Sequence, residues 1–137
     1  MSEPRDGLQS ARLTDPAFAR WRRVHRSASF VLAGLGALHS ALTPVLYRAW
    51  SPGAVWFLGT GLGLLLLSVM NLAHVGLVPC TLPTAPAVRA ANWVFLLFGI
   101  GALIAVPQPQ AVVIVVALVA QAVGGHHTLP GAGPVGS

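Results

Sequence analysis

The sequence predicts an all-α protein, a four-helix transmembrane bundle in up-down-up-down order. Three observations predict this fold: most residues are apolar, few are charged, and four long apolar runs follow a basic N-terminal segment. Of 137 residues, 55% are hydrophobic and 8% are charged, and the mean hydropathy is +0.73. A typical soluble domain is about 25% charged. Because so little polar material is available to face water, we expect most of the chain to lie in a lipid bilayer.

The four apolar runs match the thickness of a membrane. A hydrocarbon core about 30 Å thick needs roughly 20 mostly apolar residues in a helix. We expect transmembrane helices at 28–47, 54–75, 88–106 and 110–124. The last run is short and rich in Val and Ile, as a buried strand would be. A lone strand cannot satisfy its backbone groups in lipid, so we favour a helix there as well.

The segments outside these runs are more polar. We expect a basic arm at 1–26, a Pro-rich link at 76–87 and a flexible tail rich in Gly and Pro at 125–137. Asp15-Pro16 is typical of a helix N-cap followed by a first-turn proline. The arm therefore has two interpretations: a short interfacial helix that lies on the membrane, or a solvated arm that ends in a juxtamembrane anchor.

The arginines are distributed unevenly around the apolar runs. Arg89 lies just after the second link, Arg48 alone falls on the other side, and four arginines closely precede the first run, at positions 20, 22, 23 and 26. The positive-inside rule then predicts that both termini and the 76–87 link are cytoplasmic, in a multi-pass protein of the inner (plasma) membrane. Because the basic arm directly precedes an apolar run, we expect the bilayer as its partner, and no nucleic acid.

Apart from Arg89, the second residue of the third expected span, the expected spans contain no Asp, Glu, Lys or Arg. The layout resembles small multidrug exporters, but those depend on a glutamate within the first helix, which is missing here. The lone Cys80 cannot supply the cysteine pairs of membrane thiol oxidoreductases. Buried carboxylates for sterol-isomerase chemistry or for Ca²⁺ and Mg²⁺ are also missing. We therefore expect a protein that is not an enzyme.

Small and polar residues recur along one face of each expected helix, a pattern typical of helix–helix packing in membranes. In the second helix, Gly59-x-x-x-Gly63 predicts a close helix contact. His39 and Gln121 each lie about 16 Å from a helix end at 1.5 Å per residue, so we expect both near the midplane of the membrane. Because an unpaired polar group is costly in hydrocarbon, we also expect a hydrogen bond between these two side chains. The candidate intramembrane polar residues are His39, Ser40, Thr43, Thr60, Asn71 and Gln121.

Four histidines fall at the expected cytoplasmic face. His25 precedes the first helix, His74 ends the second, and His126 and His127 follow the fourth. Histidines at one level can bind a transition metal or provide the axial ligands of haem. The alternative is that they are ordinary interfacial histidines without a cofactor.

One stretch carries a family resemblance. The string HSALTPVLY at 39–47, the string AVWFLGTGLGL that begins at Ala54, and Asn71 resemble small bacterial four-helix integral membrane proteins of uncharacterised function. The resemblance covers about residues 30–75. It implies a helical bundle and no particular activity.

Two functions remain open at this point. The first is a non-enzymatic protein, either an accessory subunit of a larger membrane complex or homo-oligomer, or a bundle that binds a small hydrophobic ligand. The alternative is a haem- or metal-binding redox component or enzyme that uses the histidines of the inner face. A pore formed by oligomers ranks below both, since only the first helix has a nearly continuous polar face.

Overall fold

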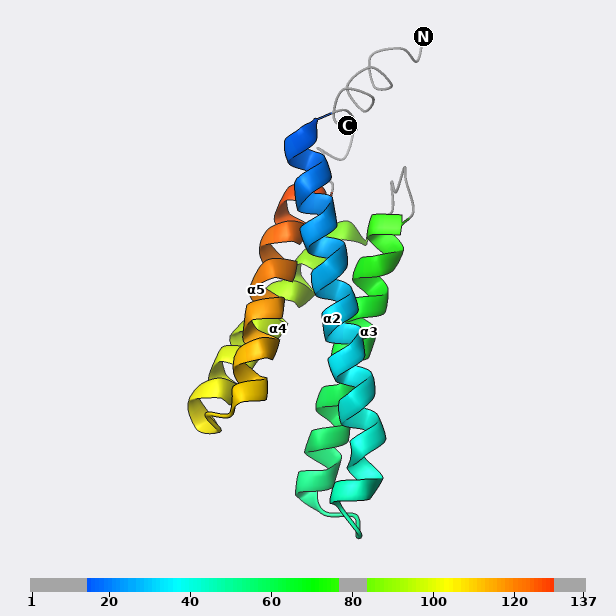
Figure 1. The fold of residues 1–137 in the computed structure, drawn as a ribbon, viewed down its shortest axis with the longest axis vertical. Coiled ribbons are helices and arrows are strands. Elements are labelled where there is room, and N and C mark those ends of the chain that lie inside the picture. The colour runs from blue at the N-terminus through cyan, green and yellow to red at the C-terminus, as the bar shows by residue number, and fades with distance from the viewer. Residues whose placement is uncertain (1–14, 77–83, 130–137) are drawn as a thin grey trace, which may run out of the picture.

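The computed structural model describes residues 15–76 and 84–129. Within these ranges the chain forms four long helices and no strand: α2 (Pro16–Leu46), α3 (Pro52–Gly76), α4 (Ala85–Ala105) and α5 (Pro109–Thr128) (Figure 1). All four are long and apolar enough to cross a membrane. The predicted all-helical fold with four long helices is therefore confirmed for the described residues.

Helix α2 begins much earlier than the first apolar run. The Asp15 side chain accepts a hydrogen bond from the Ala17 backbone N–H at 2.8 Å, and Pro16 occupies the first turn, as the sequence predicted. The helix then continues to Leu46 without a break. No Gly or Pro interrupts residues 17–33, so nothing ends the helix where the apolar run starts. The expected separate interfacial helix is instead the first part of α2.

The other helix bounds also differ from those expected. Helix α4 begins at Ala85, within the expected link, and α5 continues to Thr128, within the expected tail. Helix α5 continues through Gly124 and Gly125, and both glycines permit close packing. A Cβ atom on Gly124 would lie 2.8 Å from the Cβ of His25, and one on Gly125 would lie 2.9 Å from Asn92 Nδ2.

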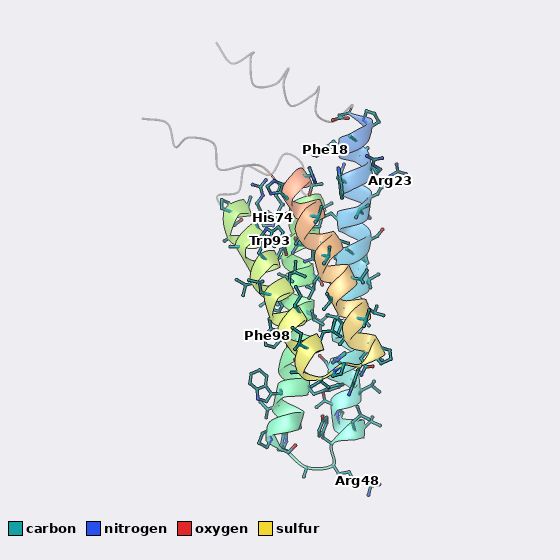
Figure 2. The ribbon with its side chains drawn as sticks, turned by 90° about the vertical axis from the view of Figure 1, so that its left-hand side faces the viewer. Phe18, Arg23, Arg48, His74, Trp93 and Phe98 are labelled. Atoms are coloured by element: carbon teal, nitrogen blue, oxygen red, sulfur yellow. The ribbon has the colours of Figure 1, made fainter. Side chains whose placement is uncertain are left out.

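Helix α2 packs between α3 and α5, and α4 packs against α5 while touching α3 only slightly. We call the end where α2 begins and α5 ends the basic end, and the opposite end the Arg48 end; Figure 2 shows Arg23 and Arg48 at these two ends. Figure 1 shows that the α4–α5 pair leans away from the α2–α3 pair and that its turn stops short of the α2–α3 turn. The bundle is thus closed near the basic end and splayed toward the other.

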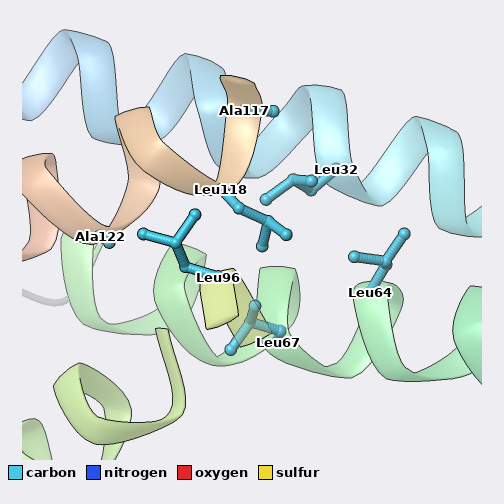
Figure 3. Close-up of a cluster of buried hydrophobic side chains, with 7 residues drawn as sticks. All are labelled: Leu32, Leu64, Leu67, Leu96, Ala117, Leu118 and Ala122. Carbon is cyan, nitrogen blue, oxygen red and sulfur yellow. The ribbon is translucent and has the colours of Figure 1, made fainter. Parts of the chain in front are cut away.

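A leucine-rich core joins all four helices in the middle of the bundle (Figure 3). It consists of Leu32, Leu64, Leu67, Leu96, Ala117, Leu118 and Ala122, all buried. Half-buried Phe95 and Ile114 pack against it. A smaller apolar cluster of Ala85, Val88 and Leu129 lies at the basic end.

The closest approach of α2 and α3 occurs at Gly36 and Gly61. A Cβ on Gly36 would lie 2.6 Å from the Gly61 carbonyl oxygen, and one on Gly61 would lie 2.8 Å from the Gly36 carbonyl oxygen. The predicted helix contact through Gly59 and Gly63 is confirmed at Gly63 alone, and there it is made with α4. A Cβ on Gly59 would meet nothing within 4 Å, and Gly63 faces Phe95 of α4. The residues of α3 that face α2 therefore lie on a different side of the helix from Gly59 and Gly63.

Candidate functional site

Buried polar side chains from all four helices meet near the basic end. His25 Nε2 lies 2.7 Å from Asn71 Oδ1, and this amide oxygen accepts a hydrogen bond from the ring N–H. Asn71 Nδ2 donates to Asn92 Oδ1 at 2.8 Å, and Asn92 Nδ2 donates back to Asn71 Oδ1 at 2.9 Å. Gln121 Nε2 donates to Asn92 Oδ1 at 3.1 Å. We call this set the His25–Gln121 network; each of its side chains is at most 1% exposed.

The second ring nitrogen of His25 extends the network to the end of α5. His25 Nδ1 lies 2.7 Å from Thr128 Oγ1, and the Thr128 hydroxyl donates to the Gly124 carbonyl oxygen at 2.8 Å. Ser29 donates to the His25 carbonyl oxygen at 2.9 Å. Both ring nitrogens of His25 are engaged, so neither can bind a metal without the loss of a hydrogen bond.

The network leaves one acceptor unused. Within the described residues, Gln121 Oε1 is buried and has no hydrogen-bond partner. Buried polar groups usually have a partner, which is often an ordered water.

The predicted hydrogen bond between His39 and Gln121 is wrong. His39 Nδ1 donates to the Leu35 carbonyl oxygen at 3.1 Å, and its ring stacks on Phe57 with centroids 4.4 Å apart. Since Gly124 packs against His25, Gln121 lies near the basic end and is separated from His39 by about 16 Å along the bundle at 1.5 Å per residue. The prediction was wrong because the two helix turns do not lie at one level: the α4–α5 turn stops short of the α2–α3 turn (Figure 1).

The remaining polar candidates bond within their own helices. Ser40, Thr43 and Thr60 each donate to the carbonyl oxygen four residues earlier, at 2.9 Å. This bond satisfies a hydroxyl without a partner from another helix. The structure therefore does not join these three hydroxyls to the His25–Gln121 network.

The four histidines do not gather at one point. His74 Nδ1 donates to the Met70 carbonyl oxygen at 2.8 Å, and its Nε2 lies 2.9 Å from Thr84 Oγ1. His126 and His127 are exposed, and His127 stacks on Trp21 with centroids 4.6 Å apart. In the part of the chain that the structure describes, no three His, Cys, Asp or Glu side chains are grouped for a metal ion.

Two arginines at the basic end bind helix C-termini. Arg22 Nη2 donates to the Val75 carbonyl oxygen near the end of α3 at 3.3 Å. Arg89 Nη2 donates to the His126 carbonyl oxygen at 3.3 Å and also to that of Leu129, where α5 ends. The last carbonyl groups of a helix lack partners within the helix and carry partial negative charge, so a cation stabilises them.

A second feature, an apolar pocket of about 480 Å³, lies between α3, α4 and α5. We call it the α3–α4–α5 pocket. Leu64 and Leu118 of the leucine core line it, and its side-chain polar groups are the Thr60 hydroxyl, already bonded within α3, and the indole N–H of Trp56. Its remaining lining residues are Gly59, Gly63, Val94, Phe95, Phe98, Gly99, Ala102, Ala111 and Ile114.

The pocket exists because α4 and α3 separate toward the Arg48 end. The lean of the α4–α5 pair produces the gap (Figure 1), and Phe98 lies on α4 on the way to the α4–α5 turn (Figure 2). Three glycines line the pocket, at positions 59, 63 and 99. Sequence analysis missed this site, and the available signal was the combination of these glycines with Trp56, Phe95 and Phe98 near them.

Comparisons with protein-family models, curated proteins and solved structures gave no match to the chain.

Proposed function

We propose that this chain is a non-enzymatic integral membrane protein that binds one hydrophobic molecule, a lipid chain or a chain of similar shape, in the α3–α4–α5 pocket. The observation that carries the proposal is the pocket itself, about 480 Å³ in volume with an almost wholly apolar lining. Binding sites for small molecules typically measure about 300–1,000 Å³. The one hydroxyl in the lining is already bonded, and the indole N–H of Trp56 is the other side-chain polar group, so the bound part of the ligand is mainly apolar.

The surface of the bundle supports insertion in a membrane. Large apolar side chains face outward, among them Phe30 (55% exposed), Leu66 (64%) and Leu97 (68%). Such a surface would aggregate in water and is stable in hydrocarbon. The arginine distribution supports an up-down topology with both termini and residues 76–87 on the cytoplasmic side of the plasma membrane.

Binding is favoured over catalysis by the residues that line the pocket. The lining contains no histidine, cysteine, carboxylate or basic side chain. General acids and bases come mainly from such groups, and the one hydroxyl that could act as a nucleophile, that of Thr60, has no base in the lining to activate it. The pocket can hold and shield an apolar molecule, and its own residues offer no means to transform one.

The test compares two glycine substitutions that add the same side chain. Gly59 lines the pocket, whereas Gly34 of α2 does not, and a Cβ at either position meets nothing within 4 Å. Gly59→Leu should fill the pocket, and Gly34→Leu should leave it open. The probe is a fatty acid that carries a photoreactive diazirine at mid-chain, added to the protein in phosphatidylcholine nanodiscs.

We expect crosslinks on the wild-type protein to concentrate on α3, α4 and α5 residues of the pocket, as mapped by peptide mass spectrometry. In Gly59→Leu, the new leucine excludes ligand carbons and weakens binding by about 1.4 kcal/mol. This change in the free energy of binding corresponds to a tenfold loss of pocket adducts. Gly34→Leu should retain the wild-type pattern. Adducts spread evenly around the bundle, or equal loss in both variants, would refute the proposal.

A further inference from the structure

A separate groove lies between α2 and α5 toward the basic end. Its volume is about 580 Å³. From α2 it is lined by Arg23, Val24, Ser27, Ala28 and Val31, and from α5 by Val112, Val113, Val116, Ala117 and Ala120. We call it the α2–α5 groove. It shares no residue with the α3–α4–α5 pocket.

The dimensions of this groove suit one acyl chain. Its lining extends over eight residue steps on each helix, from Arg23 to Val31 and from Val112 to Ala120. Because Gly124 packs against His25, the two stretches are offset along the bundle, and the groove extends about 21 Å from Arg23 to Val112 at 1.5 Å per residue. One half of a hydrocarbon core is about 15 Å thick. Apart from Arg23, no lining side chain is larger than valine, and the apolar part beyond Ser27, from Ala28 to Val112, is about 14 Å long, close to the depth of one leaflet.

The groove has a positive charge at its basic end. Arg23 is exposed, and it is the arginine that lines the groove. Its neighbour Arg22 instead donates to the Val75 carbonyl oxygen, and Arg26 lies over the Phe30 ring at 5.7 Å. Asp15, the one acidic residue in the described ranges, accepts a hydrogen bond from the Ala17 N–H at the start of α2.

We propose that the α2–α5 groove binds an anionic phospholipid, with the phosphate on the Arg23 guanidinium and one acyl chain between α2 and α5. Guanidinium groups match phosphate oxygens in geometry as well as in charge. The exposed Ser27 hydroxyl, one turn further along the groove, offers a second donor to the headgroup. This site rests on membrane insertion but not on the ligand proposed for the α3–α4–α5 pocket.

Charge favours this occupant over a second copy of the chain. Two copies that met symmetrically through this groove would bring together two basic segments, each with exposed arginines at positions 20, 23 and 26. Like charges brought together at an interface cost free energy. An anionic headgroup would instead neutralise the same segment, and basic residues next to a membrane attract anionic lipids.

The experiment measures which lipid stays bound when the protein is released from nanodiscs of equimolar phosphatidylglycerol and phosphatidylcholine with identical acyl chains. Native mass spectrometry counts each lipid on the protein. We expect preferential retention of phosphatidylglycerol, reduced about fivefold in Arg23→Gln, which corresponds to roughly 1 kcal/mol for one arginine near the surface. Arg20→Gln makes the same change of charge one turn away, outside the groove, and should retain most of the lipid.

A second pair of variants tests the acyl chain. Ala120→Leu fills the groove without a change of charge, and Ala37→Leu adds the same atoms at an exposed position of α2 that does not line it. Only Ala120→Leu should reduce retention of phosphatidylglycerol. Circular dichroism of each variant verifies that the helices are intact. Equal losses in Arg23→Gln and Arg20→Gln, or full retention in Ala120→Leu, would overturn the proposal.

A third arm separates a phospholipid from free phosphate. Inorganic phosphate or glycerol phosphate, added at millimolar concentration before release, should not displace the retained phosphatidylglycerol, because neither compound fills the apolar part of the groove. Displacement by either compound would mean that the site recognises the phosphate alone, and would contradict a phospholipid site.

Discussion

Asn92 is the residue on which the polar contacts of α4 depend. Its side chain takes part in three hydrogen bonds, two with Asn71 and one with Gln121. Hydrogen bonds between helices in membranes contribute about 0.6 kcal/mol each on average. We expect Asn92→Leu to lower the free energy of unfolding by about 2 kcal/mol, measured by reversible denaturation in a mild detergent, because it leaves buried groups on α3 and α5 without partners.

Thr60→Val is the matched control for this prediction. The Thr60 hydroxyl donates only to the Trp56 carbonyl oxygen of its own helix, so its removal breaks no contact between helices. We expect a change below about 0.5 kcal/mol. If Asn92→Leu and Thr60→Val destabilise the protein equally, the His25–Gln121 network does not hold the helices together.

The sequence predicted which polar residues to consider but not their partners. Asn71 and Gln121 were selected because they are polar within apolar runs, and both are fully buried. Their shared partner Asn92 was not among the predicted intramembrane polar candidates. Helical periodicity gives the face of one helix, whereas partners depend on how far neighbouring helices are shifted along their axes. That shift follows from side-chain packing across helices, which a single sequence does not display.

Among the helix pairs, α2 and α3 depend most on glycine. A Cβ on Gly61 would lie 2.7 Å from Ser40 Oγ and 2.8 Å from the Gly36 carbonyl oxygen, so the two backbones would have to separate. We expect Gly61→Ala to destabilise the protein by about 1–3 kcal/mol, the usual cost of overpacking. Thermal unfolding in detergent, followed by circular dichroism, measures the effect.

Gly34→Ala gives the comparison for that prediction. A Cβ on Gly34 meets nothing within 4 Å, so the substitution only reduces the flexibility of the backbone. Stability should stay the same or rise by less than about 1 kcal/mol. If Gly61→Ala costs no more stability than Gly34→Ala, the helices tolerate separation at Gly61.

The helices themselves were predicted well in number and less well at their ends. Hydropathy locates apolar runs, but a helix ends where capping or Gly and Pro end it. For this reason α2 continues through the arginines before residue 27. Helix α5 is the exception, since it passes through Gly124 and Gly125 to Thr128. Gly125 fell in the tail that we expected to be flexible, although both glycines permit the close approach of His25 and Asn92.

Across the whole molecule, polar and apolar features occupy different ends. The His25–Gln121 network and the arginines bound to the ends of α3 and α5 fasten all four helices near the basic end. Beyond the leucine core, α4 separates from α3, and the α3–α4–α5 pocket opens there. A bundle fastened at one end can leave space for a ligand at the other without the loss of its fold.

The proposed topology predicts which parts of the chain a reagent outside the cell can reach. Cys80 is the single cysteine and lies outside the described residues, between α3 and α4. If residues 76–87 are cytoplasmic, a membrane-impermeant maleimide should label Cys80 only after the membrane is opened. A variant with Cys80→Ser and Ala49→Cys, at an exposed position of the α2–α3 turn, should be labelled in intact cells.

The predicted orientation depends on few charges, and the labelling pattern distinguishes it from the reverse orientation. Only Arg48 opposes the arginines that precede the first apolar run and Arg89. Because charges close to the ends of spans set the orientation, this imbalance should fix a single topology. Labelling of Cys80 in intact cells, with protection of Ala49→Cys, would reverse the orientation and move the α2–α5 groove to the outer leaflet. It would leave the helix packing unchanged, since no contact between helices depends on which side of the membrane the basic end faces.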